Sequence, residues 1–378
     1  MNNKVNVTQI ALLMLLVITG GKFLSLPSIL AKDVGHDSWL VLCINFLFDA
    51  VTLCFLLWAV RLNKKCLGLD VILNKTVSPV VSKLVLTIFF VMFISRTILL
   101  LDSCYNTFAV TFDVNTNWIL FVLPIVAVAG FAIARGFNSV ARTAQILFAL
   151  VIFSIIAILI YPTTETDFAD LLPVGEAGFG KLMGVSFLRS FWFSDYIFIY
   201  FVLEDLQPRK HLFSPVLTSF AVGVVLTVLL NAVFVALFGD FAKDSNLAMS
   251  KIGLFSVSES ADGRWDWLTL TMWLTSVIIK IVIFVFCAYK CVEKIFEQHF
   301  AKINFVVLGV IGLCLLLPMV LSVSAFLDEF LYRCVIPFAV VQYLLPLAMP
   351  LLTKTANKRL DEQSKLTLQK TEAENAQS

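Results

Sequence analysis

Long apolar runs separated by short polar segments dominate this chain. Ten of these runs are each long enough to form a helix that crosses a bilayer, which takes about 20 apolar residues. We predict spans at residues 10–31, 38–60, 84–111, 118–134, 143–161, 184–203, 214–238, 267–289, 303–325 and 334–353. Most connections between them are short, with 162–183 and 239–266 as the exceptions. The pattern predicts an all-α, polytopic membrane protein with ten transmembrane helices.

The distribution of Lys and Arg orients the predicted spans. If the N-terminus is cytoplasmic, eighteen of these residues fall on the cytoplasmic side and six on the other side. Because cytoplasmic loops carry the excess of Lys and Arg, we expect both termini in the cytoplasm. The polar residues 354–378 then form a cytoplasmic tail, helical or disordered, after a single transmembrane domain of residues 1–353.

Composition supports a membrane protein and excludes several other classes. The chain is 60% hydrophobic and 14% charged, whereas soluble domains are about 25% charged. A net charge of +2 without a basic patch argues against nucleic-acid binding. The eight Cys form no CxxC pair, and no hydrolase or phosphate-loop motif occurs. We therefore expect no enzyme activity, no cofactor and no metal site.

The first span contains residues that interrupt a helix at mid-depth. Gly20 and Gly21 lower helix stability, and Lys22 costs roughly 3 kcal/mol in lipid unless a partner satisfies it. Membrane proteins retain such backbone where it lines a cavity, and secondary transporters place substrate sites there. We predict that Gly20 and Gly21 offer their amides to a ligand carboxylate, with Lys22 and Phe23 beside them. The alternative for the glycines is close packing against a neighbouring helix.

The span at 184–203 contains a second mid-depth interruption. Ser194 and Asp195 lie near its centre, where an aspartate costs about 2.5–3.5 kcal/mol. Ten spans divide into two sets of five, about 10–161 and 184–353, and the two interrupted spans begin the two sets. Because five is odd, the second set is inverted relative to the first. We predict a 5+5 inverted repeat with discontinuous helices 1 and 6.

The charged residues at the two breaks allow several roles. Asp195 is a candidate to receive a ligand amine or to carry a proton, and the alternative is an internal ion pair. Lys22 is a candidate to neutralise a ligand carboxylate or to stand in for sodium, or it forms a structural pair with Asp195 or Asp102. The neighbouring aromatic residues supply apolar and cation–π surface, or simply pack. They are Phe191, Trp192 and Tyr196.

Two stretches near the N-terminus resemble a known family. The sequence GGKFLSLP at 20–27, followed by LAKDVGHDSWL at 30–40, is similar to the start of spore germination permeases of the GerB family. Those proteins open with a broken first helix ending in LP, followed by A-K/R-x-x-G-x-D-x-W. Asp195 lies near a position that is often acidic in the family, and residues 208–210 resemble its Pro-Lys motif. Lys22 departs from the family pattern, which has an apolar or small residue there.

The resemblance covers essentially the whole chain and implies both a fold and a function. It implies the leucine-transporter fold of the amino acid–polyamine–cation superfamily. It also implies the B subunit of a germinant receptor in the spore inner membrane. Such a subunit is expected to bind a small germinant, such as an amino acid, and to act with a larger A subunit and a C-subunit lipoprotein. The alternatives are a secondary transporter of amino acids or amines, or a structural or conducting subunit without a small ligand.

The leucine-transporter fold also implies site residues in the third and eighth predicted spans. In related proteins the third span crosses the site, so we expect Asp102 and Tyr105 in the pocket and Arg96 paired with an acid on another span. Relatives hold sodium with hydroxyls of the eighth span. Thr275 and Ser276 are therefore ion-site candidates, and the Lys280 ammonium is a candidate substitute for the ion. The alternative for Lys280 is snorkelling towards the inner surface.

Overall fold

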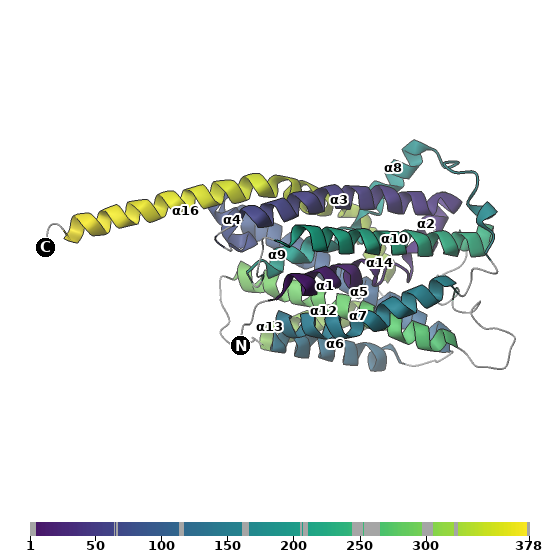
Figure 1. Ribbon diagram of the computed structural model, residues 1–378. Helices are drawn as coiled ribbons and strands as arrows, with labels where there is room; N and C mark the ends of the chain where they lie inside the picture. The colour runs from purple at the N-terminus through teal and green to yellow at the C-terminus, as the bar shows by residue number, and fades with distance from the viewer. Residues whose placement is uncertain are drawn as a thin grey trace.

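The helices lie lengthwise beside one another in a bundle, and the structure is all-helical (Figure 1). The computed structural model describes residues 5–63, 65, 67–112, 117–160, 166–204, 206, 211–243, 252, 265–296, 305–320 and 324–375. Within these residues the extended pairing consists of one isolated parallel bridge between Val5 and Leu206. The all-α prediction is therefore confirmed.

The elements follow one another along the chain without strands among the described residues. The first half contains α1 (Val7–Thr19), α2 (Leu26–Val34), η1 (Gly35–Asp37), α3 (Ser38–Leu62), α4 (Leu69–Thr76), α5 (Pro79–Phe112), α6 (Trp118–Arg135) and α7 (Phe137–Ile160). The second half contains η3 (Phe168–Leu171), α8 (Phe179–Leu188), η4 (Ser190–Trp192), η5 (Asp195–Phe198), α9 (Ile199–Val202), α10 (Phe213–Phe238), η7 (Gly239–Lys243), α12 (Trp265–Ile295), α13 (Phe305–Val320), α14 (Ser324–Arg333), α15 (Val335–Ala339), the π-helical turn η8 (Val340–Leu344) and α16 (Leu345–Asn375).

Seven of the described helices are long and apolar enough to cross a membrane, judged by length and composition. Shorter apolar helices, at Val7–Thr19, Phe179–Leu188 and Val306–Leu316, overlap the first, sixth and ninth predicted spans. The first and sixth fall short because each of those spans is interrupted near its middle. One long apolar helical segment, Leu26–Leu62, joins the second part of the first span to the second span through η1.

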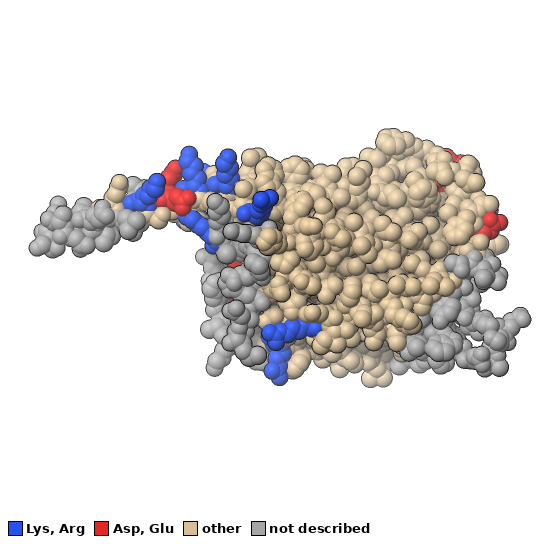
Figure 2. All heavy atoms as spheres, in the orientation of Figure 1, with Lys and Arg blue, Asp and Glu red and all other residues tan. Residues whose placement is uncertain are grey.

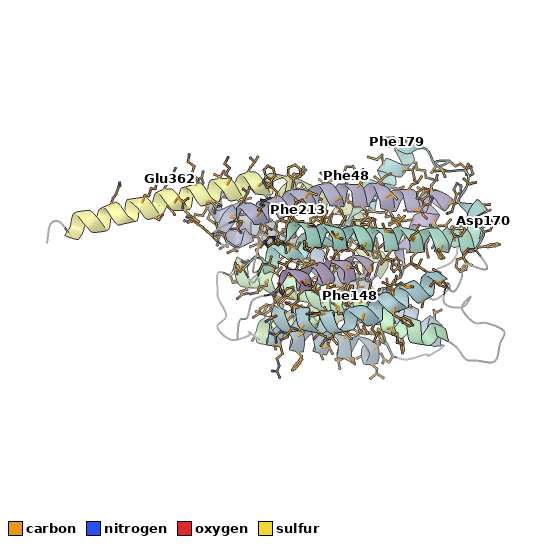
Figure 3. The ribbon with its side chains drawn as sticks, viewed as in Figure 1. Phe48, Phe148, Asp170, Phe179, Phe213 and Glu362 are labelled. Carbon is orange, nitrogen blue, oxygen red and sulfur yellow. The ribbon has the colours of Figure 1, made fainter. Side chains whose placement is uncertain are left out.

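The described surface separates into an apolar flank and charged ends. On the face in Figure 2 the described Lys and Arg gather towards the end from which α16 projects, and the middle carries neither charge colour. Phe48 on α3 is 47% exposed on this flank, and in Figure 3 it lies between Asp170 at one end and Glu362 on α16 at the other. An uncharged belt of exposed aromatic and aliphatic side chains is what lipid tails accommodate.

The interruption predicted in the first span is present. Helix α1 ends at Thr19, the Gly20 N–H donates to the Leu16 carbonyl at 2.8 Å, and α2 begins only at Leu26. A Cβ on Gly20 would lie 2.8 Å from the Leu16 oxygen and 2.9 Å from the Ser276 oxygen, both backbone atoms. Gly21 has φ of +87°, a conformation that L side chains rarely adopt. Both glycines are therefore required here, Gly20 for close approach to α12 and Gly21 for its backbone conformation.

The predicted interruption in the sixth span is also present. Helix α8 ends at Leu188 and α9 begins at Ile199, with the short turns η4 and η5 between them. Ser194 separates the two turns with φ of +61°, an uncommon conformation for a residue other than glycine. Regular helical hydrogen bonding is therefore lost in both spans, and the two breaks lie against each other through side chains described below.

The C-terminal segment is a helix that leaves the bundle. Figure 1 shows α16 projecting from the end where the described chain also begins. Asn357 Nδ2 donates to the Leu62 carbonyl at 2.9 Å, Lys65 pairs with Asp361, and the Arg359 guanidinium donates to the Lys75 carbonyl at the end of α4. The polar tail, left open as helical or disordered, is thus helical to Asn375 and fastened to the connection between α3 and α5.

We expect Gly20→Ala and Gly21→Ala each to lower stability by about 1–3 kcal/mol, because one places a methyl group against backbone oxygens and the other strains a positive φ. Thermal unfolding of the purified proteins in detergent, followed by tryptophan fluorescence, measures this change. Gly130→Ala in α6 is the matched control, since its added Cβ would meet no atom within 4 Å. A Gly21→Ala protein that melts at or above the wild-type temperature would contradict this account of the first break.

Candidate functional site

The buried carboxylate of Asp195 lies at the contact between the two helix breaks. It forms ion pairs with Lys22, with Lys280 at 2.9 Å from Nζ to Oδ2, and with Arg96 at 3.5 Å from Nη1 to Oδ1. Exposure is 2% for Lys22, 5% for Arg96, and 3% for both Asp195 and Lys280. We call these four residues the charge cluster. Water barely reaches the cluster, so its charges are screened mainly by one another.

Four separate parts of the chain bring the charge cluster together. Lys22 comes from the break between α1 and α2, and Asp195 begins η5 in the second break. Arg96 comes from the middle of α5, and Lys280 from α12. Buried charges are tolerated when they are paired, so each member depends on the positions of the other three. The cluster therefore ties both interrupted segments to the two helices that pack around them.

The unusual backbone at Ser194 is held by a second buried carboxylate. Asp49 on α3 is 2% exposed; its Oδ2 accepts from the Ser194 N–H at 2.8 Å and its Oδ1 accepts from the Ser194 hydroxyl at 2.9 Å. Beside it, the Tyr196 hydroxyl lies 2.6 Å from Thr52 Oγ1 and 2.9 Å from the Gln342 carbonyl. These bonds offset the cost of the positive φ and fix the direction of Asp195.

Aromatic rings surround the cations of the cluster. The Lys22 ammonium lies 5.6 Å from the Phe46 ring centroid and 5.5 Å from that of Phe193. Phe284 lies 5.5 Å from the Lys280 ammonium and 5.9 Å from the Arg96 guanidinium carbon. Ring faces within about 6 Å attract cations, and the attraction grows where water is excluded. The rings therefore stabilise positive charge while keeping the site dry.

Arg96 is only partly satisfied in this arrangement. Its Nη2 donates to the Phe193 carbonyl within the second break. Its Nε and Nη1 are buried and make no hydrogen bond to the residues that the structure describes, although Nη1 remains in the ion pair with Asp195. Buried donors are nearly always bonded in native proteins, so unused donors at a functional site call for an acceptor.

A small cavity adjoins the charge cluster, and we call it the central cavity. Its free space is about 10 Å³, room for about one water molecule. The lining combines charged groups and apolar side chains. It comprises Gly21, Arg96, Leu99, Leu100, Phe191, Trp192, Asp195, Lys280 and Phe284. In this conformation a ligand larger than water would have to move side chains on entry.

A larger cavity, the vestibule, is lined by two of the same aromatic residues. Its volume is about 110 Å³, and Phe191 and Trp192 line it as well as the central cavity. Asp33 at the end of α2 and Arg189 after α8 also line it. They form a bidentate pair, with Arg189 Nε 2.7 Å from Asp33 Oδ2 and Nη2 3.1 Å from Oδ1. Phe191 and Trp192 thus line both cavities.

Another ion-pair group lies towards the end from which α16 projects. Lys294, near the end of α12, pairs with Asp70 of α4 and lies 2.8 Å from Glu204 Oε1, two residues beyond α9. The Lys294 side chain is 7% exposed. Its position links α4, the end of the interrupted sixth span and α12. The two ends of the bundle are therefore each held by charge pairs that involve the interrupted segments.

The structure brings many of the predicted site residues together. Lys22, Ser194, Asp195 and Lys280 are connected through ion pairs or adjacent backbone, and Gly21, Phe191 and Trp192 line the central cavity with two of them. Gly20 adjoins this group but serves packing against α12. Arg96 pairs with an acid on another span, as predicted. Among the described residues no three His, Cys, Asp or Glu side chains are placed to share a metal ion.

Other predicted residues lie outside the lining of the central cavity. Asp102 accepts from Asn106 Nδ2 at 3.2 Å, and the Tyr105 ring packs 6.0 Å from Phe121. Phe23 packs against Trp273, with ring centroids 6.2 Å apart.

The hydroxyl groups predicted to form an ion site donate hydrogen bonds to backbone carbonyls of their own helix, α12. Thr275 donates to the Met272 carbonyl at 2.6 Å and Ser276 donates to the Trp273 carbonyl at 2.7 Å. Tyr196 is buried against Thr52 and Gln342, as described above, and is absent from the cavity lining.

Sequence reasoning missed Asp49, Thr52 and Gln342. Asp49 lies in the middle of the second predicted span, where an acidic side chain is costly and marks a functional or structural site. Phe46, Asp49 and Thr52 also recur at intervals of three, which places them along one side of a helix. A polar stripe within an apolar span could therefore have identified Asp49 and Thr52 as site residues. Gln342 lies in the π-helical turn η8, and the sequence carries no comparable mark for its role.

We expect Asp195→Asn to lower stability by about 3–5 kcal/mol, because three buried cations lose their shared carboxylate. Combining it with Lys22→Met should restore part of the loss, since one unpaired charge is removed. Thermal unfolding of the single and double variants in detergent measures the coupling. Glu362→Gln, which removes an exposed pair with Lys358 at 3.9 Å, is the control and should have little effect. Strictly additive losses would show that the cluster is not energetically coupled.

Comparison with known proteins places the chain in a family. A crystal structure of the manganese transporter of Eremococcus coleocola, in complex with an aromatic bis-isothiourea substituted compound, has a similar fold. The likeness has a TM-score of 0.58 and 12% identity, and covers 93% of this chain and 85% of the transporter, so it speaks for the fold alone. No curated protein matches the sequence. The model of the family described as spore germination protein matches residues 4–324. The chain therefore belongs to the spore germination protein family, and it shares a helical transporter fold.

Proposed function

We propose that this chain is the B subunit of a spore germinant receptor, and that it binds a small germinant, such as an amino acid, at the charge cluster. The observation that carries the proposal is the buried cluster itself, held between two interrupted spans and open to the central cavity. Four ionisable side chains buried at the middle of a membrane bundle are costly, and such residues mark ligand or ion sites. Membership of the spore germination family supports the biological setting.

The proposed architecture is a ten-helix, leucine-transporter-like arrangement of two inverted five-helix repeats, about 10–161 and 184–353. The support is the position of the two breaks, one in the first span of each proposed repeat. The ion pair between Lys22 and Asp195 joins the breaks, as expected where two repeats meet at a shared site. The manganese transporter aligns over most of both chains, which is compatible with this arrangement.

The proposed location is the spore inner membrane, with both termini in the cytoplasm. The apolar flank and the excess of Lys and Arg at the end with α16 support this orientation. Helix α16, within the polar tail 354–378, would then extend into the cytoplasm. The vestibule with Asp33 and Arg189 would face the opposite side, from which a germinant reaches the receptor.

In this proposal, ligand binding changes the balance between two arrangements of the bundle. A ligand that contacts Arg96, Lys280 and the first break would alter how Asp195 holds the interrupted spans together. The charge pairs at the two ends, Asp33 with Arg189 and Lys294 with Asp70 and Glu204, would break or form in turn. Ligands act by differential affinity for such states. The A subunit and the C-subunit lipoprotein are the proposed partners that respond to the change.

A secondary transporter of amino acids or amines is the second candidate. The observation in its favour is that the vestibule and the central cavity share Phe191 and Trp192, so movement of two rings would open a path towards the cluster. The likeness in fold to a transporter is compatible with this reading.

We expect Trp192→Ala to change the range of germinants that trigger germination, because it removes a large side chain that lines both cavities. Spores that carry the variant in place of the wild-type chain, scored across a panel of amino acids, provide the measurement. Trp58→Ala, which removes a 51% exposed tryptophan on α3, is the matched control and should leave the range unchanged. An identical response profile in the Trp192→Ala spores, at normal protein level, would place the site elsewhere.

Proteoliposomes containing only this chain separate the two candidate functions. As a receptor subunit, the chain should bind a germinant without concentrating it, so labelled amino acid inside the vesicles should not exceed the bound amount. Sodium should not increase binding at constant ionic strength, because the Lys280 ammonium already occupies the contact with Asp195. Saturable uptake against a gradient would favour the transporter.

A further inference from the structure

We infer that, among small germinants including amino acids, the charge cluster selects carboxylates with net negative charge over neutral zwitterions and amines. The inference rests on the proposed function, because it concerns the ligand of the same site. Three buried cations converge there on one carboxylate, and two of them line the central cavity. Charge, hydrogen-bonding capacity and the lining of the cavity each favour such an anion.

Basic side chains outnumber acidic side chains at the site. Lys22, Arg96 and Lys280 are three basic groups, whereas Asp195 and the nearby Asp49 are two acidic groups. All five side chains are buried, with 5% exposure or less. An uncompensated buried charge is unfavourable, and an anion placed among the three cations would neutralise it.

Hydrogen-bond donors also exceed acceptors. Each lysine ammonium has three N–H donors, yet both ammonium groups share the same acceptor, Oδ2 of Asp195. Arg96 lines the central cavity, and within the described part of the chain its Nε and Nη1 have no hydrogen-bond partner. Both Asp49 oxygens are already bonded to Ser194. A ligand carboxylate brings acceptors only and would use the donors that the protein leaves unused.

The charge cluster disfavours the binding of a ligand ammonium. Asp195, the acidic residue that lines the central cavity, is already shared by three cations. An added ammonium would become a fourth cation near them and would be repelled. The remaining side chains of the lining are apolar, from Leu99, Leu100, Phe191, Trp192 and Phe284. These apolar side chains offer no partner to a second charged group on a ligand.

Three small probes of similar size test the inference: acetate, glycine and ethylammonium. The purified full-length chain in detergent is titrated with each at constant ionic strength, and the shift of the thermal unfolding midpoint is measured. We expect a saturable upward shift with acetate, half-complete at about tenfold lower concentration than with glycine, because glycine adds a repelled charge. Ethylammonium should give no saturable shift.

Variants connect the effect to the cluster. Lys280→Met should abolish the acetate shift, whereas Lys280→Arg, which keeps the charge, should retain it if the protein tolerates the larger group. Lys358→Met on α16 is the control, because that side chain is 79% exposed and distant from the cavity lining. Lys22→Met removes a cation without altering the cavity lining and should weaken the acetate shift. This variant replaces Lys280→Met in the test if Lys280→Met does not fold.

The outcomes separate the inference from the proposed function. A saturable shift with glycine or ethylammonium, but not with acetate, would overturn the inference and leave a ligand site in place. An acetate shift that keeps its wild-type size in the lysine-to-methionine variants that fold would also overturn it, because the anion would bind elsewhere. The absence of any saturable shift with all three probes would contradict both the inference and the proposed site.

Discussion

The pairing of one buried carboxylate with three cations is the interaction on which the rest of this structure depends. Asp195 joins the break in the sixth span to the break in the first span through Lys22, to α5 through Arg96 and to α12 through Lys280. Charges at this depth persist only when they are paired. The positions of four otherwise separate segments are therefore coupled, and the broken backbone is held open rather than closing into continuous helices.

The breaks themselves were predictable because their causes are local. Adjacent glycines and a mid-span lysine mark the first break, and a mid-span aspartate marks the second. The pairing between Lys22 and Asp195 could be named as an alternative, since each charge requires a partner in lipid. The π-helical turn at 340–344 and the left-handed conformation of Ser194 could not be predicted, because they arise from contacts with distant helices.

The differences between the predicted site residues and the lining of the central cavity have a geometric cause. On α5, Arg96, Leu99 and Leu100 follow one another at helical spacing and line the central cavity together. Tyr105 comes nine residues after Arg96, and at about 100° per residue it points to roughly the opposite side of the helix. A span can be assigned from hydropathy, but its rotation about its own axis depends on packing. Thr275 and Ser276 show the same limit, since their hydroxyls bond to their own helix.

Helix α4 gives the bundle a mechanical property. Its first turn is joined through Asp70 and Lys294 to Glu204, just beyond the interrupted sixth span, and its last carbonyls receive Arg359 of α16. A shift of the sixth span would therefore be transmitted through the short helix α4 to the part of α16 at Arg359. Sixteen residues of helix follow Arg359, about 24 Å. A tilt of about 10° at Arg359 would displace the C-terminal end of α16 by roughly 4 Å. Small rotations of the attached part of α16 therefore become larger displacements at its far end.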